Sequence, residues 1–342
     1  MKSYRKNYPR PQFVRKSWQN LNGQWDFSFD DMDAGERNQW YHNFPKARKI
    51  EVPFTYETEL SGIQDETAHQ AVWYRRTFSV DREEIHGKDL MLRFEGSDYH
   101  TKVWINGNYA GSHKGGYTRF SFCITDLVFP GINEIVVKVE DSLDEQQPRG
   151  KQRWKNENFG CWYIQTTGIW KTVWMETVPK NHIESIKLTP DLGRKVLNLT
   201  AAVSLQDSGE NCSLRAEVSF KDHTVAIERV KVLGSRISFA IKIDSTEIDE
   251  WGVKVWRPEN PDLYDLRLTL LCGEDRQDEI LSYFGMRDIG VSDGHIMLNG
   301  APLYQRLILD QGYWKKSGLT PPDEQALVND IKTILSMGYN GV

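Results

Sequence analysis

Apolar and polar residues alternate with a period of two along much of residues 18 to 178. In QWDFSF the side chains of Trp25, Phe27 and Phe29 fall on one face, and LMLRF (90–94) and EIVVKVE (134–140) repeat the pattern. This period is typical of half-buried strands. Between two such runs, KVWINGNYAG contains Asn-Gly, a pair that favours a tight hairpin because both residues tolerate positive φ. With almost no helical periodicity, the region is predicted to form two packed antiparallel sheets, a sandwich or jelly roll.

A second series of short strands is predicted after residue 180. Aromatic density falls around ETVPKNHIES (176–185), where Pro179 interrupts the alternation, and the runs VLNLTAAVSL, CSLRAEVSF, RISFAIKI and LYDLRLTLL follow. About a hundred residues of this kind match the size of an immunoglobulin-like sandwich. The sequence therefore predicts two β-domains, at residues 1–180 and 181–287.

The pattern changes again across residues 288–342. A short apolar run, PLYQRLIL (302–309), is followed by the loop DQGYWKKSGL and by a segment with helical spacing. Thr320 and Asp323 are predicted to form a capping box and Gly338 to end the helix, whose apolar face would carry Leu327, Ile331, Ile334 and Leu335. Strand, loop, helix and strand make a βαβ unit. Because such a unit needs a parallel sheet covered on both faces, we expect it to be truncated here.

Composition and charge limit the classes of partner that the chain is expected to bind. The formal net charge is −5, from 43 basic and 48 acidic residues without a long run of either sign, which gives no footprint for nucleic acid or an anionic membrane. No apolar run is long enough to span a bilayer, and the basic N-terminus lacks the apolar segment of a signal peptide. We therefore expect a cytoplasmic chain that binds a neutral or small polar partner, with no nucleic-acid or membrane partner.

The cysteines and histidines show no ligand spacing. The four cysteines, at positions 123, 161, 212 and 272, contain no C-x-x-C pair, and the eight histidines are scattered. We expect four reduced, mostly structural thiols, and neither a metal ion nor a cofactor.

Eight segments, taken together and in order, resemble glycoside hydrolase family 2, which contains β-galactosidases, β-glucuronidases and β-mannosidases. The resemblance covers nearly the whole chain. It implies a mainly β fold: a jelly-roll-like sugar-binding sandwich, an immunoglobulin-like sandwich, and from about residue 288 a linker and the truncated first βα unit of a (β/α)8 TIM barrel. A complete barrel takes ~250 residues, so six or more βα units would follow. The segments are LNGQWDFSF (21–29), VPFTYETELSG (52–62), VWYRRTF (72–78), TKVWINGNYAGSHKGGYTRFSFCITD (101–126), TTGIWKTVWME (166–176), PENPDLYDL (258–266), YFGMRDI (283–289) and LNGAPLYQR (298–306).

The resemblance implies a retaining O-glycoside hydrolase that acts on terminal β-linked sugars, with β-galactosidase favoured by family frequency. Retention needs two carboxyl groups about 5 Å apart. In the family both are glutamates on later barrel strands, and the acid/base follows an asparagine. Asn133-Glu134 is interpreted instead as a solvated strand end and Asn156-Glu157 as a solvated loop. We assign no catalytic residue, expect both glutamates beyond Val342, and expect the chain alone to be inactive.

Two segments are candidate sugar contacts. DQGYW follows the first barrel strand, and sites of barrel enzymes lie on such loops. Its carboxylate and amide suit sugar hydroxyls and its rings suit a pyranose face, although a merely structural loop is the alternative. The family usually shows a glycine after the barrel-strand arginine and then Asn and His-Glu or His-Asp. Here Arg306 is followed by Leu307, and Asp310-Gln311 stand in place of the other residues, which leaves the exact substrate open. The candidates are Asp310, Gln311, Tyr313 and Trp314.

The second segment is the polar excursion PRGKQRWKNENFGCWYIQTTGIW (148–170), which in the family reaches toward the barrel mouth. It mixes hydrogen-bond donors with flat rings. Trp170 and Trp174 alternate with Thr172 and are predicted as core residues, whereas Trp162 fits either role. The candidates are Arg149, Lys151, Trp154, Trp162 and Gln165.

The alternative function is a non-catalytic carbohydrate-binding β-sandwich protein, with the aromatic-rich first domain as a lectin face. The βαβ start at 302–342 argues against it, since a lectin has no reason to carry one. A purely structural interaction module would leave the polar and aromatic excursion unexplained. The resemblance implies a carbohydrate substrate as partner and assembly into homo-oligomers.

Overall fold

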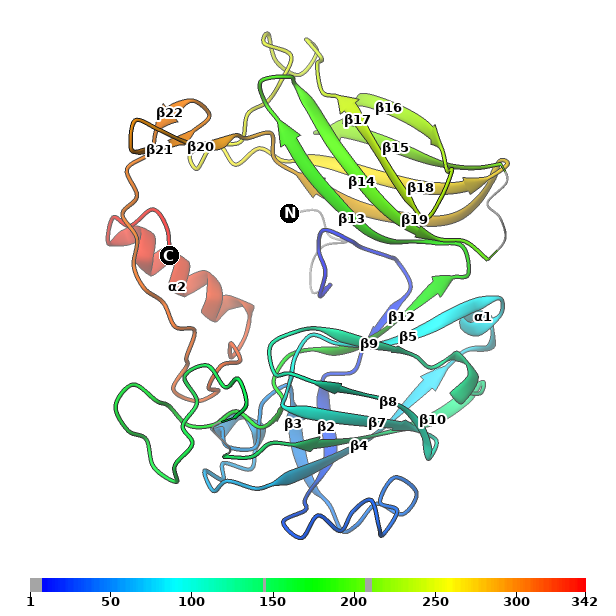
Figure 1. The fold of residues 1–342 in the computed structure, drawn as a ribbon, viewed down its shortest axis with the longest axis vertical. Helices are drawn as coiled ribbons and strands as arrows, with labels where there is room; N and C mark the ends of the chain where they lie inside the picture. Colours follow the sequence, from blue (N-terminus) through cyan, green and yellow to red (C-terminus); the bar gives the residue numbers. More distant parts are fainter. Residues whose placement is uncertain (1–7, 144–145, 207–210) are drawn as a thin grey trace. The chain divides into compact units, whose positions relative to one another are not determined.

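The structure is a computed structural model that describes residues 8–143, 146–206 and 211–342 (Figure 1). The chain divides into two compact units. One contains Val178–Arg306 together with the N-terminal residues through Lys16, and the other contains Ser17–Thr177 together with Leu307–Val342. Each unit is described by itself.

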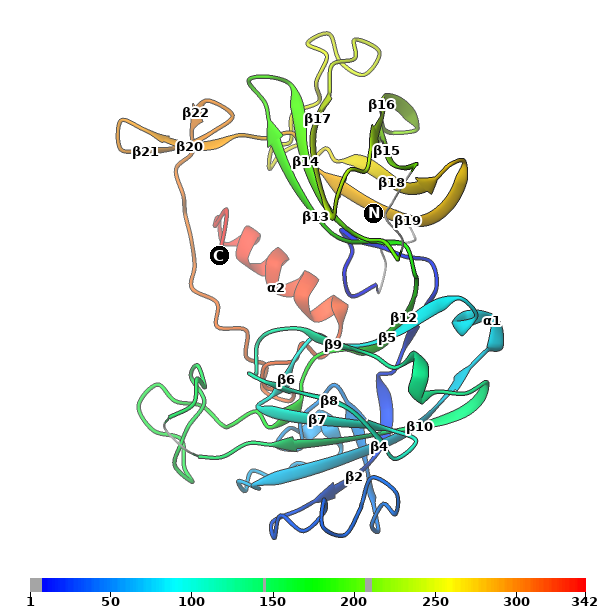
Figure 2. The same cartoon turned by 45° about the vertical axis from the view of Figure 1, so that its right-hand side comes forward.

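The unit that begins at Ser17 is a sandwich of two main sheets, as the alternation predicts. Figures 1 and 2 both show β4, β10, β7 and β8 side by side. The four-stranded sheet has the order β1 (Trp18–Asn20), β12 (Val173–Pro179), β5 (Lys88–Phe94) and β9 (Phe120–Cys123). The six-stranded sheet has the order β3 (Arg48–Val52), β2 (Gly23–Phe29), β4 (Ala71–Val80), β10 (Gly131–Glu140), β7 (His100–Ile105) and β8 (Asn108–Lys114).

Short elements complete this sandwich. They are the strand pair β6 (Ser97–Asp98) and β11 (Gly168–Ile169), the helix α1 (Arg82–Ile85), and the 3₁₀ turns η2 (Glu59–Ser61) and η3 (Thr125–Leu127). The predicted hairpin joins β7 to β8, with Asn106 at φ 51° and Gly107 at φ 79°. A Cβ on Gly107 would lie 2.1 Å from the His42 ring, so only glycine fits this turn.

The core of this sandwich lies between its sheets and follows the period of two. On β10, Ile135, Val137 and Val139 are fully buried in one cluster with Phe27 of β2 and Leu92 of β5. Val136, one position away, faces outward and belongs to a second, smaller aromatic cluster, described below. Both faces of the six-stranded sheet are therefore covered where β4, β10 and β7 adjoin.

Within the described residues, the other unit is an immunoglobulin-like sandwich of seven main strands. One sheet has the order β13 (His182–Asp191), β14 (Val196–Ser204) and β17 (Arg236–Lys242), and the other β16 (His223–Lys231), β15 (Cys212–Phe220), β18 (Tyr264–Cys272) and β19 (Asp275–Phe284). The N-terminal segment is attached to this unit, because the guanidinium of Arg15 donates to Asp278 at 2.8 Å and to the Ile183 carbonyl at 2.6 Å.

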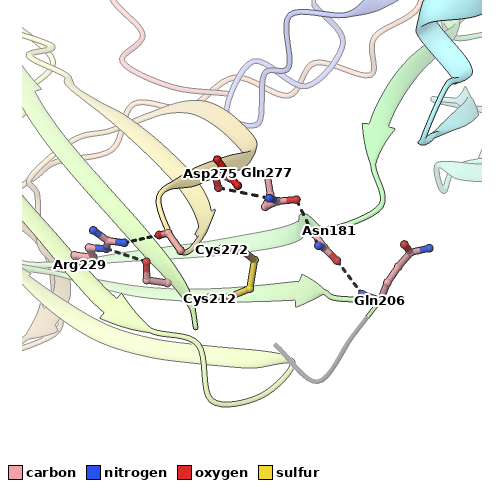
Figure 3. The surroundings of a disulfide bond; sticks show 9 residues. Asn181, Gln206, Cys212, Arg229, Cys272, Asp275 and Gln277 are labelled. Carbon is pink, nitrogen blue, oxygen red and sulfur yellow. Dashed lines mark hydrogen bonds between the residues drawn. A yellow bond between two sulfur atoms is a disulfide. The ribbon is translucent and has the colours of Figure 1, made fainter. Parts of the chain in front are cut away.

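The prediction of four reduced thiols is wrong. Cys212 and Cys272 form a disulfide bond, because they are direct partners in the register of β15 and β18 (Figure 3). Sixty residues separate them in sequence, so their spacing gave no sign of this pairing. Beside the bond, Arg229 donates to the Ser213 hydroxyl and to the Gly273 carbonyl, each at 2.9 Å. The other two cysteines, 123 and 161, are free and exposed.

Residues 289–342 only partly follow the prediction. The strands β20 (Ile289–Ser292), β21 (His295–Leu298) and β22 (Ala301–Pro302) form a small sheet. The expected strand at 302–309 is reduced to one parallel bridge, in which Leu307 pairs with Gly341. A lone strand segment without neighbours on its other side has few ladder bonds to make.

The predicted helix forms as α2 (Glu324–Ser336), and Gly338 follows its C-cap with φ 86°. The predicted capping box is wrong. Asp323 is the N-cap and accepts from the Ala326 N–H at 2.7 Å, whereas the Thr320 hydroxyl donates to the Trp170 carbonyl at 2.6 Å. No helix in the described ranges is long and apolar enough to cross a membrane.

Candidate functional site

The two candidate segments meet in the unit formed by Ser17–Thr177 and Leu307–Val342. The Tyr163 hydroxyl donates to Gln311 Oε1 at 3.0 Å, and the rings of Tyr163 and Tyr313 lie 4.6 Å apart between centroids. Burial raises the pKa of Tyr313 to about 12, so its phenol remains a hydrogen-bond donor at neutral pH. Tyr163 was not predicted, although it lies in the aromatic part of the polar excursion.

The loop after the bridge at Leu307 is held firmly against the sandwich. The buried Thr320 hydroxyl bonds to the Trp170 carbonyl, and the Leu60 N–H donates to the Lys316 carbonyl at 3.1 Å. Lys316 also forms an ion pair with Glu59 at 2.7 Å. These anchors fix the position of residues 310–314 relative to the excursion.

Within this loop the candidates differ in exposure. Tyr313 and Trp314 are half-buried, whereas Asp310 and Gln311 are exposed. Asp310 Oδ1 accepts from the Gly312 N–H at 2.8 Å, and the Trp314 N–H donates to the Gly318 carbonyl at 2.9 Å, which closes a turn. The carboxylate of Asp310 and the amide of Gln311 therefore remain reachable from solvent.

Two candidates of the excursion serve largely to fold it. Arg149 is buried and donates to the Ser142 carbonyl at 3.0 Å. Gln165 is also buried, and its Oε1 accepts from Arg153 Nε at 2.9 Å, while both side chains donate to the Glu66 carbonyl. Arg153 was not predicted. Its partners could not be inferred from sequence, because they lie up to 87 residues away.

The prediction that Trp170 and Trp174 are core residues is confirmed, whereas the role of Trp162 was left open. Trp170 and Trp174 are buried, and Trp170 Nε1 donates to the Gly116 carbonyl at 2.8 Å. Trp162 is half-buried and packs edge-on against Trp154 at 4.6 Å, in an aromatic cluster of the excursion that Phe159 completes. The side chain of the remaining candidate, Lys151, is exposed.

A polar hollow of about 320 Å³ lies beside the excursion. Amide, carboxyl, hydroxyl and imidazole groups converge on it, and this mixture both donates to and accepts from hydroxyl groups. Among the described residues, its lining contains neither Lys nor Arg. The polar lining includes His69, Gln70, Asp141, Asn156, Gln165 and Thr167.

Three buried carboxyl groups support the chain behind this hollow. Thr167 bridges two of them: its N–H donates to Glu57 Oε1 at 2.9 Å and its hydroxyl to Asp141 Oδ2 at 3.0 Å. Burial raises the pKa of Glu57 to about 8. Burial also raises the pKa of Asp141 and of Asp98, and the charge of Asp141 raises that of Asp98 further. The third carboxyl group is that of Asp98, whose Oδ2 accepts from the Gln152 amide at 2.6 Å.

The Asn-Glu pairs lie outside any barrel strand. The interpretation of Asn133 as a solvated strand end is wrong, because its side chain is buried and bonds to the N–H and carbonyl of Phe129. Asn156 and Glu157 are exposed in a loop, as expected. Among the described residues, no three His, Cys, Asp or Glu side chains gather in a way that could hold a metal ion.

Comparison with known proteins decides the family. Residues 18–179 match the family model described as glycosyl hydrolases family 2, sugar binding domain, and residues 181–287 match the one described as glycosyl hydrolases family 2. The chain belongs to glycosyl hydrolase family 2. The resemblance drawn from the eight sequence segments is thus confirmed for both β-domains.

Relatives within family 2 are glycosidases by name. A putative β-glucuronidase of Formosa agariphila is 28% identical over 303 residues, which cover 86% of this chain and 34% of that protein. A β-galactosidase of Thermoanaerobacter pseudethanolicus is 28% identical over 299 residues, or 84% of this chain and 36% of that protein. The chain thus spans about a third of the length of these relatives.

Solved structures share the fold. The apo β-glucuronidase of Ruminococcus gnavus superposes with a TM-score of 0.76 at 19% identity, over 99% of this chain and 56% of that one. A β-glucuronidase from an uncultured Clostridium sp. gives a TM-score of 0.73 at 22% identity, over 96% of this chain and 55% of that one.

Proposed function

We propose that these residues are the sugar-binding N-terminal part of a retaining O-glycoside hydrolase that removes terminal β-linked sugars, and that a β-galactoside is its substrate. The observation that carries the proposal is the meeting of the two candidate segments at Tyr163, Gln311 and Tyr313. Rings and hydrogen-bonding groups from both segments form one wall of a saccharide pocket. In the proposal, both catalytic glutamates belong to sequence outside these 342 residues, so the chain alone is inactive.

Residues 307–342 support a barrel as the missing part. The bridge between Leu307 and Gly341 is parallel, and α2 lies between its two halves in sequence, which is the arrangement of a βαβ unit. Apolar side chains at the expected spacing are left in water: Leu309 is 81% exposed and Leu335 59%. Further strands and helices would cover them, and the length of the relatives leaves room for such elements.

The hollow beside the excursion favours a neutral sugar. A glucuronide carries a carboxylate, which enzymes usually bind with Arg or Lys. The described lining offers Asp141 and the amides of Gln70, Asn156 and Gln165 instead. These groups suit hydroxyls and would repel a uronate when Asp141 is ionised. This supports a galactoside over a glucuronide, although relatives carry both names.

A panel of chromogenic glycosides tests the proposal. The 4-nitrophenyl β-galactoside, β-glucuronide, β-mannoside and β-glucoside are incubated with the full-length protein and with residues 1–342. We expect fastest release from the galactoside by the full-length protein and none by the fragment. Release by the fragment would overturn the placement of the carboxylates. Preference for the glucuronide would overturn the sugar, and no release by the full-length protein would favour the non-catalytic carbohydrate-binding alternative.

The wall itself is tested in the full-length protein. Replacing Tyr313 with Ala should raise KM by about tenfold or more, because a lost aromatic contact of this kind costs roughly 0.5–1.5 kcal/mol beyond its buried area. The matched control is Trp251→Ala, which removes an exposed aromatic side chain outside the contact between the two segments. Equal KM values for the two variants would remove Tyr313 from the site.

A further inference from the structure

A second aromatic cluster covers the outer face of the six-stranded sheet. Trp73 of β4, Trp104 of β7 and Val136 of β10 point away from the main core and are buried under Trp40, Tyr41 and Phe44 of the loop between β2 and β3. The rings are ordered: Trp104 stacks on Trp73 at 5.4 Å and on Tyr41 at 5.3 Å, with interplanar angles of 18° and 7°. None of these residues contributes to the candidate site described above.

A hollow of about 360 Å³ opens beside this stack and is lined by Glu36, Tyr41, Lys102, Trp104 and Tyr109. Tyr109 stands at its edge on β8, 55% exposed, with its ring 5.8 Å from that of Trp104. The hollow thus combines one accessible aromatic ring, two further rings beneath it, and a carboxylate beside an ammonium group.

The loop that forms one side of the hollow is fixed in place. The buried Asp30 carboxylate accepts from the Ala34 N–H at 2.8 Å, from the Gly35 N–H at 2.9 Å and from Trp73 Nε1 at 2.9 Å. Gly35 lies so close to the Trp73 ring that a Cβ would be 2.6 Å from it. Because the loop is held by these contacts, a ligand would not need to order it on binding.

The carboxylate of the hollow keeps one oxygen available. Glu36 Oε1 accepts from Lys102 at 2.6 Å and from the buried Lys138 at 2.9 Å, whereas Oε2 has no hydrogen bond from the described residues. Burial alone would raise the pKa of Glu36, but the bonds and charges of the two lysines outweigh it and lower the pKa. Glu36 is therefore an ionised acceptor at neutral pH.

We propose that this hollow is a second carbohydrate-binding site, which takes one uncharged pyranose unit of a polysaccharide. The apolar face of the ring would pack on Tyr109, and adjacent hydroxyls would donate to Glu36 Oε2 and accept from Lys102. Lys102 and Lys138 form ion pairs with three carboxylates, those of Asp33, Glu36 and Glu140, so this network has no net positive charge to attract an acidic sugar or a phosphate. Such a site would hold the protein on a polymer, independently of the wall formed by Tyr163 and Tyr313.

Native affinity electrophoresis of the 342-residue chain tests this site. The gels contain a galactan, a xylan, a glucan or a mannan, all uncharged. We expect at least one polymer to retard the chain, Tyr109→Ala to raise Kd at least tenfold, and Glu36→Gln to raise it at least threefold. Tyr109→Phe, which keeps the ring, should bind like the wild type.

Two control variants separate this site from others. Tyr304→Ala, an exposed tyrosine elsewhere, should leave retardation unchanged, whereas Tyr313→Ala reports any binding at the candidate site. The proposal is overturned if no polymer retards the chain, if Tyr109→Ala is retarded as strongly as the wild type, or if Tyr313→Ala rather than Tyr109→Ala abolishes retardation. The last outcome would assign the binding to the candidate site. Circular dichroism confirms that each variant is folded.

Discussion

Strand β5 and helix α2 both carry leucines at the spacing that their secondary structure requires, yet the two regions differ completely in burial. Leu92 of β5 is 0% exposed, whereas Leu335 of α2 is 59% exposed. The facing sheet covers β5, whereas no element among the described residues covers the apolar face of α2 in this way. Periodicity therefore predicts which face an element presents, but burial depends on whether its partner is present.

The largest expected effect contrasts these two leucines. Leu92→Ala should lower the free energy of unfolding of its sandwich by about 2–5 kcal/mol, because it leaves a cavity in a packed core. Leu335→Ala should change it by less than about 0.5 kcal/mol, since its side chain is already in water. Urea denaturation followed by tryptophan fluorescence measures both.

The same pair also tests the proposed barrel. In the full-length protein, Leu335→Ala should become as costly as a core substitution, because further elements would cover α2. If Leu335→Ala stays neutral there, α2 is a surface helix and the support from its exposed face is lost.

A second comparison uses two aspartates that bond to backbone N–H groups. Asp30 is buried and also accepts from Trp73 Nε1, so Asp30→Ala should cost about 2–3 kcal/mol by leaving buried donors unpaired. Asp323 is the exposed N-cap of α2, and Asp323→Ala should cost about 1 kcal/mol. Urea midpoints measure the first, and the helical signal in circular dichroism the second. Similar losses of stability in the two variants would show that burial of the aspartate does not determine how much stability is lost.

The last comparison concerns pH. The pKa of Glu57 is about 8 in the folded chain and near 4.5 in the unfolded one, so between these values the folded state holds the extra proton. Stability contributed by Glu57 is therefore present below pH 4.5 and falls as pH rises toward 8, by roughly 1 kcal/mol per pH unit. Glu57→Gln should remove this slope from urea denaturation curves at pH 5.5, 6.5 and 7.5.

The control for Glu57 lies two residues away. Glu59→Gln also removes one carboxylate, but that carboxylate is exposed and paired with Lys316, so the variant controls for net charge. If both variants retain the wild-type slope, Glu57 does not titrate with burial.

The sequence predicted those parts of the fold that bury one face of a strand. Strands β2, β5 and β10 were found because core and solvent impose a period of two on them. Strand β16 was missed, because it lies at a sheet edge with most side chains at least partly exposed, and so shows no regular apolar face. The disulfide was missed because strand register cannot be read from cysteine spacing.

The candidate site was predictable as two segments but not as contacts. Composition indicated the excursion and the loop at 310–314, since both are unusually rich in polar and aromatic residues for connections between strands. The partners of Arg149 and Gln165 are set by the folded chain, as are the roles of Tyr163 and Thr167. The outer hollow escaped prediction for the same reason, because Glu36 and Tyr109 come from different elements.

The disulfide between β15 and β18 duplicates a link that the sheet already makes. The ladder continues from Ser213, opposite Leu271, to Ser219, opposite Asp265, so the alignment of these strands does not depend on the sulfur bond. Oxidation would act chiefly on the unfolded chain, where it closes a loop of about 60 residues and removes entropy worth roughly 2–4 kcal/mol. The domain can therefore adopt the same fold in oxidising and in reducing surroundings. The redox state then changes only its free energy of unfolding.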